Sequence, residues 1–166
     1  MRYSIIIPSF NSSNHITSKI TKLINLLNKI SIKYEIIIVD DCSTDNSPTK
    51  IIKLISSNKK IRIKMIKNTI NTGKSFSIRK AIIRSNYEKI ILIDSDLPYL
   101  YKLENIINSL KKFDLVMIDR KHGKSKNLDR SFTFYQFFRI QIGAVFNKII
   151  RVFLPINYRD TQAGLK

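Results

Sequence analysis

The chain has 166 residues, a formal net charge of +18 at pH 7 and one cysteine, Cys42. Its length fits one domain with a hydrophobic core. A single cysteine excludes a disulfide within the chain, and the lack of an apolar run of about 18 residues excludes an obvious membrane-spanning helix. The charge indicates a polyanionic neighbour such as nucleic acid, an anionic membrane or a phosphorylated substrate. We expect a cytoplasmic protein, because one cysteine fits a reducing compartment and the first residues carry no signal-peptide pattern.

Short apolar runs alternate with helix-like stretches along the chain. The predicted elements are a strand over 3–8, a helix from Ser12 or Ser13 to 31, a strand over 34–39, a helix over 47–56, a strand over 61–66, a helix over 73–84, a strand over 89–93, a helix over 101–111 and a strand over 115–118. Continuous β-branched runs are typical of strands covered on both faces. The repeated strand–helix order therefore predicts an α/β fold with a mostly parallel sheet flanked by helices.

Polar residues follow every predicted strand. They occupy positions 8–11, 40–41, 71–74, 94–96 and 119–120. In open parallel sheets, ligands bind beyond the carboxyl ends of the strands. We therefore expect the chemistry of this protein on one rim of the sheet.

Asp94 and Asp96 are the most informative of these residues. In an extended segment, residues i and i+2 point the same way, so the two carboxylates can hold one hard divalent cation. Mg²⁺ and Mn²⁺ prefer oxygen ligands and often bridge protein carboxylates to phosphates. The alternative is a pair of solvated aspartates that cap the following helix.

Asp40 and Asp41 are adjacent acids at the end of the second predicted strand. Two like charges so close together are unfavourable unless a cation or hydrogen-bond donors satisfy them. One of them could accept a hydrogen bond from a base or ribose while the other faces a metal. The alternative is that Asp41, Ser43 or Asp45 forms a turn before the helix at Ser47, and for Asp45 we expect this turn role.

The chain changes in character after Arg120. Residues 121–130 form a basic loop, and 131–153 combine phenylalanine and isoleucine with cationic residues. This pattern predicts an amphipathic helical segment that lies in a membrane interface, because its cations are hard to bury; a core helix packed on the sheet is the alternative. We expect a catalytic domain over 1–130. The interface helix and a polar motif then occupy 131–166, and a motif so near the last residue suggests a shortened chain.

Four segments resemble, in order, the motifs of the family 2 glycosyltransferases. They are SIIIPSFN at 4–11, EIIIVDDCSTD at 35–45, NTGK at 71–74 followed by RKA at 79–81, and DSD at 94–96. The resemblance covers nearly the whole chain and implies the Rossmann-like GT-A fold, with Asp94 and Asp96 as the metal-binding DxD motif for Mg²⁺ or Mn²⁺. It also implies a nucleotide-sugar site formed by Pro8, Ser9, Phe10, Asn11, Asp40, Asp41, Ser43, Gly73, Lys74, Asp94 and Ser95.

Later segments resemble a subgroup, the polyprenyl-phosphate sugar transferases, which include dolichyl-phosphate glucosyl- and mannosyltransferases. They are Asp119–Arg120, Arg130–Ser131 and DTQAGLK at 160–166, the last being closest to the glucosyltransferase form. The resemblance implies inverting transfer of a hexose, from UDP-glucose in preference to GDP-mannose, to a polyprenyl or dolichyl phosphate. It places the protein peripherally at the cytosolic face of an anionic membrane. The implied catalytic residues are Asp96, Asp160, Arg120 and Arg130.

Two departures from the family pattern bear on the site. Ser12 stands where the family often has glutamate, and Pro98 stands where mannosyl members often have glutamine. Pro98 removes one side chain that could serve as a third metal ligand. The resemblance therefore implies a metal site with fewer protein ligands than some relatives use.

Two other functions remain open from the sequence. The chain could be a family 2 glycosyltransferase that acts on a soluble or glycan acceptor, with Asp160 as a carboxylate base. From a different class, it could be a non-catalytic basic module that binds nucleic acid or a membrane. The clustered acids on the rim argue against nucleic acid there, because they repel phosphate unless a metal intervenes, so we expect no nucleic-acid partner.

Overall fold

The computed structural model describes residues 1–119 and 165. The elements are β1 (Arg2–Ser9), α1 (Ile16–Ile30), β2 (Lys33–Asp40), α2 (Ser47–Ser57), β3 (Ile63–Lys67), α3 (Lys74–Ile83), β4 (Lys89–Leu92), the 3₁₀ helix η1 (Leu100–Lys102) and α4 (Leu103–Ser109). The chain divides into two compact units, one formed by Met1–Val116 with Gly164–Lys166 and the other by Met117–Ala163. The predicted domain boundary after residue 130 and the predicted helix over 131–153 lie outside the described residues.

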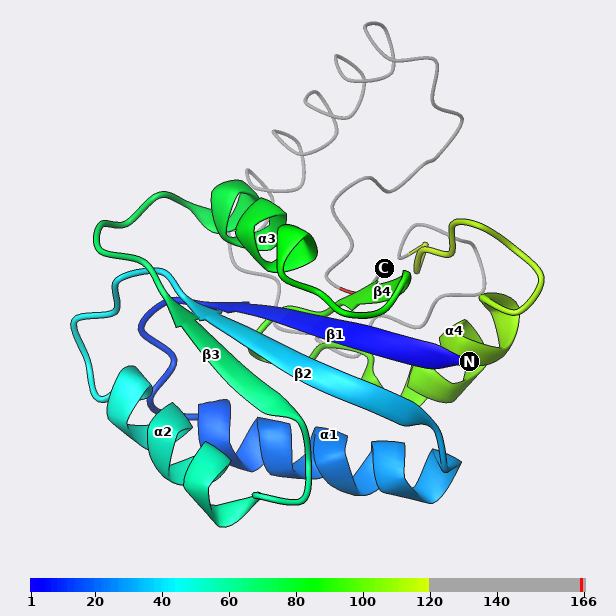
Figure 1. Cartoon of the computed structure of the whole chain (residues 1–166), viewed down its shortest axis with the longest axis horizontal. Helices are drawn as coiled ribbons and strands as arrows, with labels where there is room; N and C mark the ends of the chain where they lie inside the picture. The colour runs from blue at the N-terminus through cyan, green and yellow to red at the C-terminus, as the bar shows by residue number, and fades with distance from the viewer. Residues whose placement is uncertain (120–164, 166) are drawn as a thin grey trace, which may run out of the picture. The chain divides into compact units, whose positions relative to one another are not determined.

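The described strands form one parallel sheet in the order β3-β2-β1-β4 (Figure 1). β1 lies in the middle and pairs with β2 from Arg2↔Lys33 to Ser9↔Asp40 and with β4 from Tyr3↔Lys89 to Ile6↔Leu92. Helices connect the successive strands, as a parallel sheet requires. The predicted α/β fold with a mostly parallel sheet flanked by helices is therefore confirmed.

Helices cover both faces of this sheet, α1 and α2 on one side and α3 on the other (Figure 1). On the α3 side, Ile6, Ile37 and Val39 form a buried cluster with Ala81 of α3. Since side chains alternate along a strand, the intervening isoleucines point to the α1 and α2 side. That layer is completed by an apolar stripe of α1, consisting of Ile16, Ile20, Leu23, Ile24 and Leu27.

One predicted strand and one predicted helix start are wrong. Residues 115–118 do not form a fifth strand. β4 pairs only with β1 among the described strands, and Leu115 is left exposed, so an apolar run of four residues was not sufficient evidence for a strand. α1 begins at Ile16 with His15 as its N-cap, not at Ser12 or Ser13. The Ser12 hydroxyl instead donates to Phe10 O and lies 3.1 Å from Ser95 Oγ, which commits it to the rim of the sheet.

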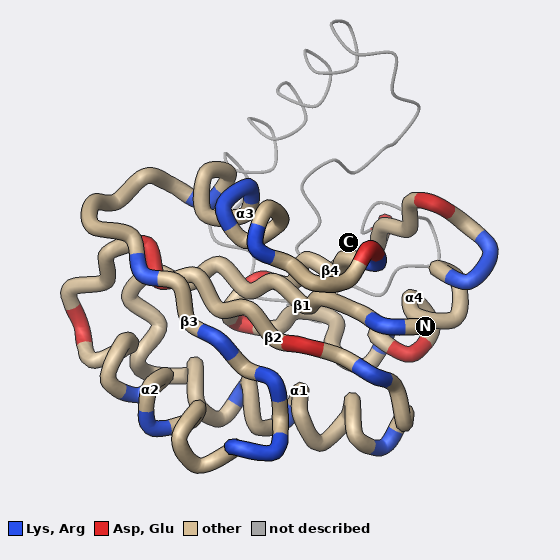
Figure 2. The backbone as a smooth tube through the Cα atoms, viewed as in Figure 1, with Lys and Arg blue, Asp and Glu red and all other residues tan. Residues whose placement is uncertain are grey.

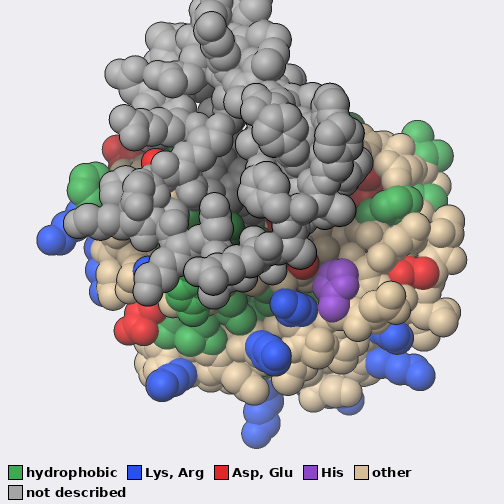
Figure 3. All heavy atoms as spheres, turned by 180° about the vertical axis from the view of Figure 1, so that it is seen from behind, with side chains coloured by type: hydrophobic (Ala, Val, Ile, Leu, Met, Phe, Trp, Pro, Cys, Tyr) green, Lys and Arg blue, Asp and Glu red, His purple; other side chains and the backbone are tan. Residues whose placement is uncertain are grey.

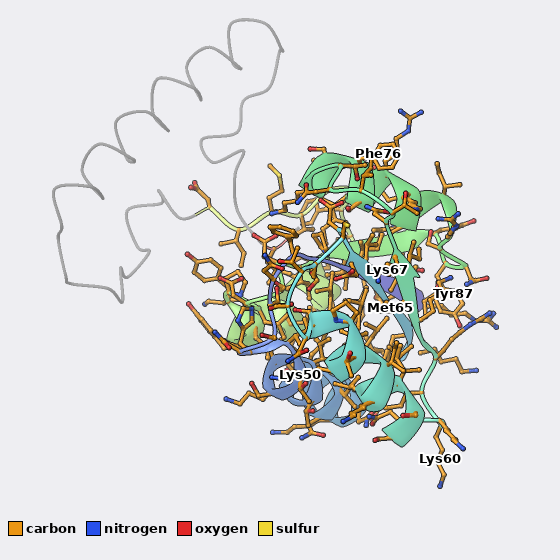
Figure 4. All side chains as sticks on the ribbon, turned by 90° about the vertical axis from the view of Figure 1, so that its left-hand side faces the viewer. Lys50, Lys60, Met65, Lys67, Phe76 and Tyr87 are labelled. Carbon is orange, nitrogen blue, oxygen red and sulfur yellow. The ribbon has the colours of Figure 1, made fainter. Side chains whose placement is uncertain are left out.

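Basic residues are spread over the described part of the protein. They occur along β3 and in the segment before it (Figure 2), and they are scattered over the face seen in Figure 3. Seen from the β3 side, Lys60 extends outward near the start of that strand, and Lys67 lies on the strand itself (Figure 4). Lysines on a strand at the edge of a sheet discourage pairing with another chain. Within residues 1–119 and 165, no helix has the length and apolarity needed to cross a membrane.

Candidate nucleotide-sugar site

A pocket of about 290 Å³ opens between the carboxyl end of β1, the segments that follow β2 and β4, and the first turn of α3. It is lined by Pro8, Ser9, Phe10, Asp41, Lys74, Ser77, Asp94 and Ser95. All but Ser77 belong to the nucleotide-sugar site predicted from the sequence. The prediction that the candidate residues meet on one rim therefore agrees with the position of this pocket.

Asp41 organises the loop that leads into α3. Its Oδ1 accepts hydrogen bonds from the backbone N–H of Thr72 at 3.0 Å, from Thr72 Oγ1 at 3.0 Å and from Asn68 Nδ2 at 2.7 Å. Its Oδ2 accepts from the backbone N–H of Gly73 at 2.8 Å. Gly73 has a φ of 84°, a conformation that favours glycine, and serves as the N-cap of α3. One carboxylate thus fixes the backbone immediately before Lys74.

These contacts keep Asp41 ionised. Burial alone raises the pKa of this carboxyl group, because desolvation disfavours the charged form. The hydrogen bonds from Thr72, Asn68 and Gly73 outweigh that effect and lower the pKa of Asp41 from 3.8 to about 2. Asp41 is therefore a permanent anion in the pocket lining at neutral pH.

Asp40 has a different environment from its neighbour. It is fully buried, and its Oδ2 accepts a long hydrogen bond, 3.3 Å, from the backbone N–H of Ser43. Among the described residues, its Oδ1 has no hydrogen-bond partner, and neither does the buried hydroxyl of Ser9, its register partner on β1. Because adjacent strand residues face opposite sides of a sheet, Asp40 and Asp41 cannot serve one ligand in the same way. Of the two, only Asp41 lines the pocket.

Asn11 and Ser43 join the loops after β1 and β2. The backbone N–H of Asn11 donates to Ser43 Oγ at 2.9 Å, and Asn11 Oδ1 accepts from the backbone N–H of Thr44 at 2.9 Å. Neither Asn11 nor Ser43 lines the pocket.

Asp45 accepts hydrogen bonds from the backbone N–H groups of Ser13 and Ser47, both at 2.9 Å, so its predicted turn role is confirmed.

The segment after β4 presents one carboxylate to the pocket. Asp94 lines the pocket and forms an ion pair with Lys74, whereas Asp96 is exposed and does not line it. Leu97 adopts a left-handed φ of 48° and is buried, which turns the chain directly after the triplet. Ile93, one residue before Asp94, forms an antiparallel bridge with Leu165. The structure therefore brings Leu165, a residue of the predicted acceptor motif, beside the residue that precedes Asp94.

The oxygen ligands on this rim suit a hard divalent cation that is bound partly by the protein and partly by the phosphates of a substrate. Among residues 1–119 and 165, no three acidic, histidine or cysteine side chains gather as a ready-made metal cage. Mg²⁺ does not require one, because it is usually bound by one or two carboxylates together with substrate phosphates. Asp94 already has a cation on its Oδ1, the Lys74 ammonium, which shows that this carboxylate faces a cation position next to the pocket. The residues present therefore fit a Mg²⁺ or Mn²⁺ ion.

Sequence reasoning missed Ser77, and it predicted three residues that the structure does not describe. Ser77 is fully buried on the first turn of α3, and its hydroxyl lies 3.0 Å from Asn68 Nδ2. The sequence signal that could have indicated it is a serine four residues after a helix-opening glycine, Gly73. Arg120, Arg130 and Asp160, predicted to act in catalysis, lie outside the described residues.

The pocket lies where the sequence motifs meet, and a comparison with protein families gives the assignment. The model of glycosyl transferase family 2 matches residues 4–160. The chain belongs to that family. The predicted family 2 membership is thereby confirmed. No curated protein sequence matches the chain significantly.

Solved structures support the same fold for this family 2 chain. A mannosyltransferase from Pyrobaculum calidifontis, PcManGT, solved in complex with GDP-Man and Mn²⁺, has a TM-score of 0.56 and 22% identity over 66% of this chain and 32% of its own. Glucosyl-3-phosphoglycerate synthase from Mycobacterium tuberculosis, solved with UDP, has a TM-score of 0.51 and 18% identity over 68% of this chain and 41% of its own. These likenesses show the GT-A fold. The match covers less than half the length of either solved structure.

Proposed function

We propose that this chain forms the donor-binding core of a metal-dependent glycosyltransferase that moves a hexose from a nucleotide-sugar to a polyprenyl or dolichyl phosphate. One observation carries the proposal. A pocket at the carboxyl ends of three parallel strands combines a permanent anion, Asp41, with the cation-binding carboxylate of Asp94 and the ammonium of Lys74. A nucleotide-sugar needs the same combination, because its base and ribose offer hydrogen-bond donors and its diphosphate needs cations.

The pocket lining suggests how the donor would bind. Asp41 retains acceptor capacity on Oδ2, which receives one hydrogen bond, and can accept from a base N–H or a ribose hydroxyl. Phe10 is 48% exposed and offers an aromatic surface beside Pro8. Asn11 and Ser43, which join the two loops, support this wall from outside the pocket. UDP-glucose is the favoured donor, with GDP-mannose as the alternative, on the resemblance of the DTQAGLK segment.

A bound Mg²⁺ or Mn²⁺ would supply charge neutralisation for the leaving diphosphate. Asp94 would hold it from the pocket, and Asp96 is the second carboxylate of the triplet. Lys74 lies where its ammonium can reach the same phosphates. PcManGT, which was solved with GDP-Man and Mn²⁺, supports the use of a divalent metal within this fold.

The acceptor chemistry needs positioning more than a strong base. A phosphate monoester has a second pKa near 6, so it is already largely a dianion and a nucleophile at neutral pH. In the proposed reaction a phosphate oxygen attacks the anomeric carbon, the bond from that carbon to the diphosphate oxygen breaks, and the nucleoside diphosphate departs from the opposite side with inversion. Arg120 and Arg130 would hold the acceptor phosphate, and Asp160 would complete the acceptor site.

The lipid acceptor also gives the positive charge a role. A protein with a net charge of +18 is attracted to an anionic membrane surface, where a polyprenyl phosphate resides. We therefore propose a peripheral location at the cytosolic face of a membrane, with the segment 131–153 in the interface. This part of the proposal rests on the sequence, because these residues lie outside the described part of the chain.

Nucleotide-dependent thermal stability tests the donor site. UDP or GDP should raise the melting temperature only when Mn²⁺ is present, and ADP and CDP should raise it less. Asp94→Asn should abolish the metal-dependent part of the shift, whereas Glu104→Gln, a matched charge removal on α4, should leave it intact. If no nucleotide stabilises the protein with Mn²⁺, while DNA binds in a salt-sensitive manner, the chain is a basic binding module and the proposal fails.

A transfer assay then tests the acceptor. A panel of labelled nucleotide-sugars is incubated with Mn²⁺ and either a polyprenyl phosphate or free sugars. Label that enters the organic phase only with polyprenyl phosphate supports the proposal, and label on a free sugar identifies a soluble-acceptor enzyme. Asp160→Asn separates these functions further, because loss of a general base should harm transfer to a neutral hydroxyl far more than transfer to a phosphate dianion.

A further inference from the structure

The ion pair between Lys74 and Asp94 occupies the position where a metal is expected. Lys74 Nζ contacts Asp94 Oδ1, and both residues line the pocket. Lys74 is the first residue of α3, and Asp94 follows β4, so the pair joins two segments that are far apart in sequence. The side chain of Lys74 is 56% exposed and that of Asp94 is 33% exposed, which leaves room for an incoming ion to reach the carboxylate.

The backbone at Lys74 is held in place, whereas its ammonium is at the end of a flexible, partly exposed side chain. Asp41 accepts hydrogen bonds from the backbone N–H groups of Thr72 and Gly73, the two residues directly before Lys74. The backbone at this helix start is therefore fixed relative to β2. By contrast, the Lys74 ammonium forms an ion pair with Asp94 and with no other residue in the described part of the chain. A lysine side chain is a compact charge on a flexible four-carbon stem, so it can exchange one oxygen partner for another without backbone movement.

We propose that Lys74 is an exchangeable cation that occupies Asp94 in the free protein and moves to the diphosphate of the donor when a divalent metal binds Asp94. This inference rests on the proposed donor site and adds a coupling between its two ligands. A divalent ion and an ammonium on one carboxylate oxygen repel each other, so the metal must displace the lysine. The diphosphate supplies new acceptor oxygens for the displaced ammonium.

The exchange makes metal and nucleotide binding cooperative. Without a nucleotide, the metal must compete with Lys74, which weakens its binding. With a nucleotide, the diphosphate accepts Lys74 and ligates the metal, so each ligand raises the affinity of the other by the same factor. The lysine also lowers the negative charge of the empty pocket, where Asp41 is permanently ionised, and so favours entry of an anionic donor.

The test measures Mn²⁺ binding to the free protein, from the electron paramagnetic resonance signal of unbound Mn²⁺, in the wild type, Lys74→Met, Lys74→Arg and Lys22→Met. Lys22 is an exposed residue of α1 outside the pocket and is the matched control. Lys74→Met should bind Mn²⁺ roughly threefold to fivefold more tightly than the wild type, the size expected for loss of a partly exposed ion pair. Lys74→Arg and Lys22→Met should not gain affinity, because the first keeps the competing charge and the second never held it.

A second measurement follows the coupling factor, the ratio of Mn²⁺ dissociation constants without and with UDP. Lys74→Met should lower this ratio and weaken UDP binding, whereas Lys22→Met should change neither. Unchanged or weaker Mn²⁺ binding to free Lys74→Met overturns the inference. If the wild type binds no nucleoside diphosphate with Mn²⁺, the proposed function fails. The Mn²⁺ measurements on the free protein still decide whether Lys74 competes with the metal.

Discussion

The two ends of β2 each bury a carboxylate on the face of the sheet that α3 covers, but they balance its charge differently. At the amino end, Glu35 is fully buried and accepts hydrogen bonds from Ser4 Oγ at 2.7 Å and from Asn86 N at 2.6 Å. Two cations complete its shell, Lys64 Nζ at 3.4 Å and Arg62 Nε at 3.8 Å. Burial by itself raises the pKa of Glu35, and these hydrogen bonds with the charge of Lys64 lower it below its usual value.

At the carboxyl end, the nearest partners of Asp41 are all neutral. Its direct hydrogen bonds come from Asn68, Thr72 and Gly73, and the ammonium of Lys80 reaches it only through Asn68 Oδ1, at 2.7 Å. Dipoles therefore stabilise the charge of Asp41 without cancelling it. The carboxylate at the amino end is thus neutralised by lysine and arginine within a structural ion cluster, which we call the closed end. The carboxylate at the carboxyl end, which we call the open end, keeps its negative charge and can attract a ligand that brings its own cation.

The largest loss of stability should follow from removing the carboxylate of Glu35 at the closed end. Glu35→Ala leaves Lys64 and Arg62 without their anion and leaves the N–H of Asn86 without its acceptor. Removing one partner of a buried pair is strongly destabilising, so we expect a loss of about 3 kcal/mol in the free energy of unfolding, measured with urea. Glu35→Gln, which keeps an acceptor oxygen, should lose less. A loss below about 1 kcal/mol for Glu35→Ala would show that the cluster is not a structural anchor.

Neutralising Asp41 at the open end should reduce the free energy of unfolding less than Glu35→Ala does, but it should weaken nucleotide binding. Asp41→Asn turns an amide N–H₂ toward donors of the loop, and we expect a loss of about 2 kcal/mol in the free energy of unfolding. Mn²⁺-dependent binding of UDP should fall at least about tenfold, which corresponds to one lost charge-assisted hydrogen bond. Calorimetric titration measures the binding. Equal nucleotide affinity in Asp41→Asn and the wild type would contradict the distinction between the two ends.

Acidification should remove the contribution of Asp41 in a defined range of pH. Its pKa is about 2 in the folded protein and 3.8 as its ordinary value, so the unfolded chain takes up the proton first as the pH falls. The stabilisation is therefore fully present above about pH 5 and decreases toward pH 2, with about 1 kcal/mol lost by pH 3. Urea unfolding of the wild type and Asp41→Asn at pH 6, 4 and 3 isolates this contribution, because Glu35 is common to both. The stability difference between the two proteins should shrink as the pH falls; a constant difference would be inconsistent with the lowered pKa.

The smallest effect should come from the indirect cation. Lys80→Met removes the hydrogen bond to Asn68 but leaves every direct partner of Asp41 in place. We expect a loss of about 0.5 kcal/mol in the free energy of unfolding and little change in the affinity for UDP with Mn²⁺. A loss as large as that of Asp41→Asn would mean that Lys80 compensates the charge of Asp41 after all.

Local patterns were sufficient to predict the order of strands and helices. β1, β2 and β4 each contain consecutive apolar residues, β3 combines isoleucine and methionine with lysine, and Gly73 and Ser47–Pro48 mark two helix starts correctly. The wrongly predicted strand at 115–118 is entirely apolar, so its composition gave no reason to reject it. Among the described residues it has no partner strand, and the pairing of a strand depends on the whole sheet.

The different roles of neighbouring residues within the site could not be predicted from the sequence. Asp40 and Asp41 are adjacent and chemically identical, and their difference depends on Asn68 and Thr72, which follow Asp41 by 27 and 31 residues. The use of Ser12 in a contact with Ser95 was hidden for the same reason, since 83 residues separate them. Motif spacing indicated which residues reach the rim, whereas long-range contacts decide which face the pocket.

The left-handed residues around the rim have an energetic consequence. After each of the four described strands, the chain turns through a residue with positive φ: Asn11 at 47°, Cys42 at 61°, Gly73 at 84° and Leu97 at 48°. For residues with a side chain such as Cys42 and Leu97, this conformation is disfavoured by roughly 1 kcal/mol or more. Four of the six positive-φ residues in the described part of the chain thus lie in the loops after the strands, and the other two are Ser31 and Tyr99. Stability gained in the core thereby maintains, at the ligand-binding edge, a backbone geometry that these segments would not adopt alone.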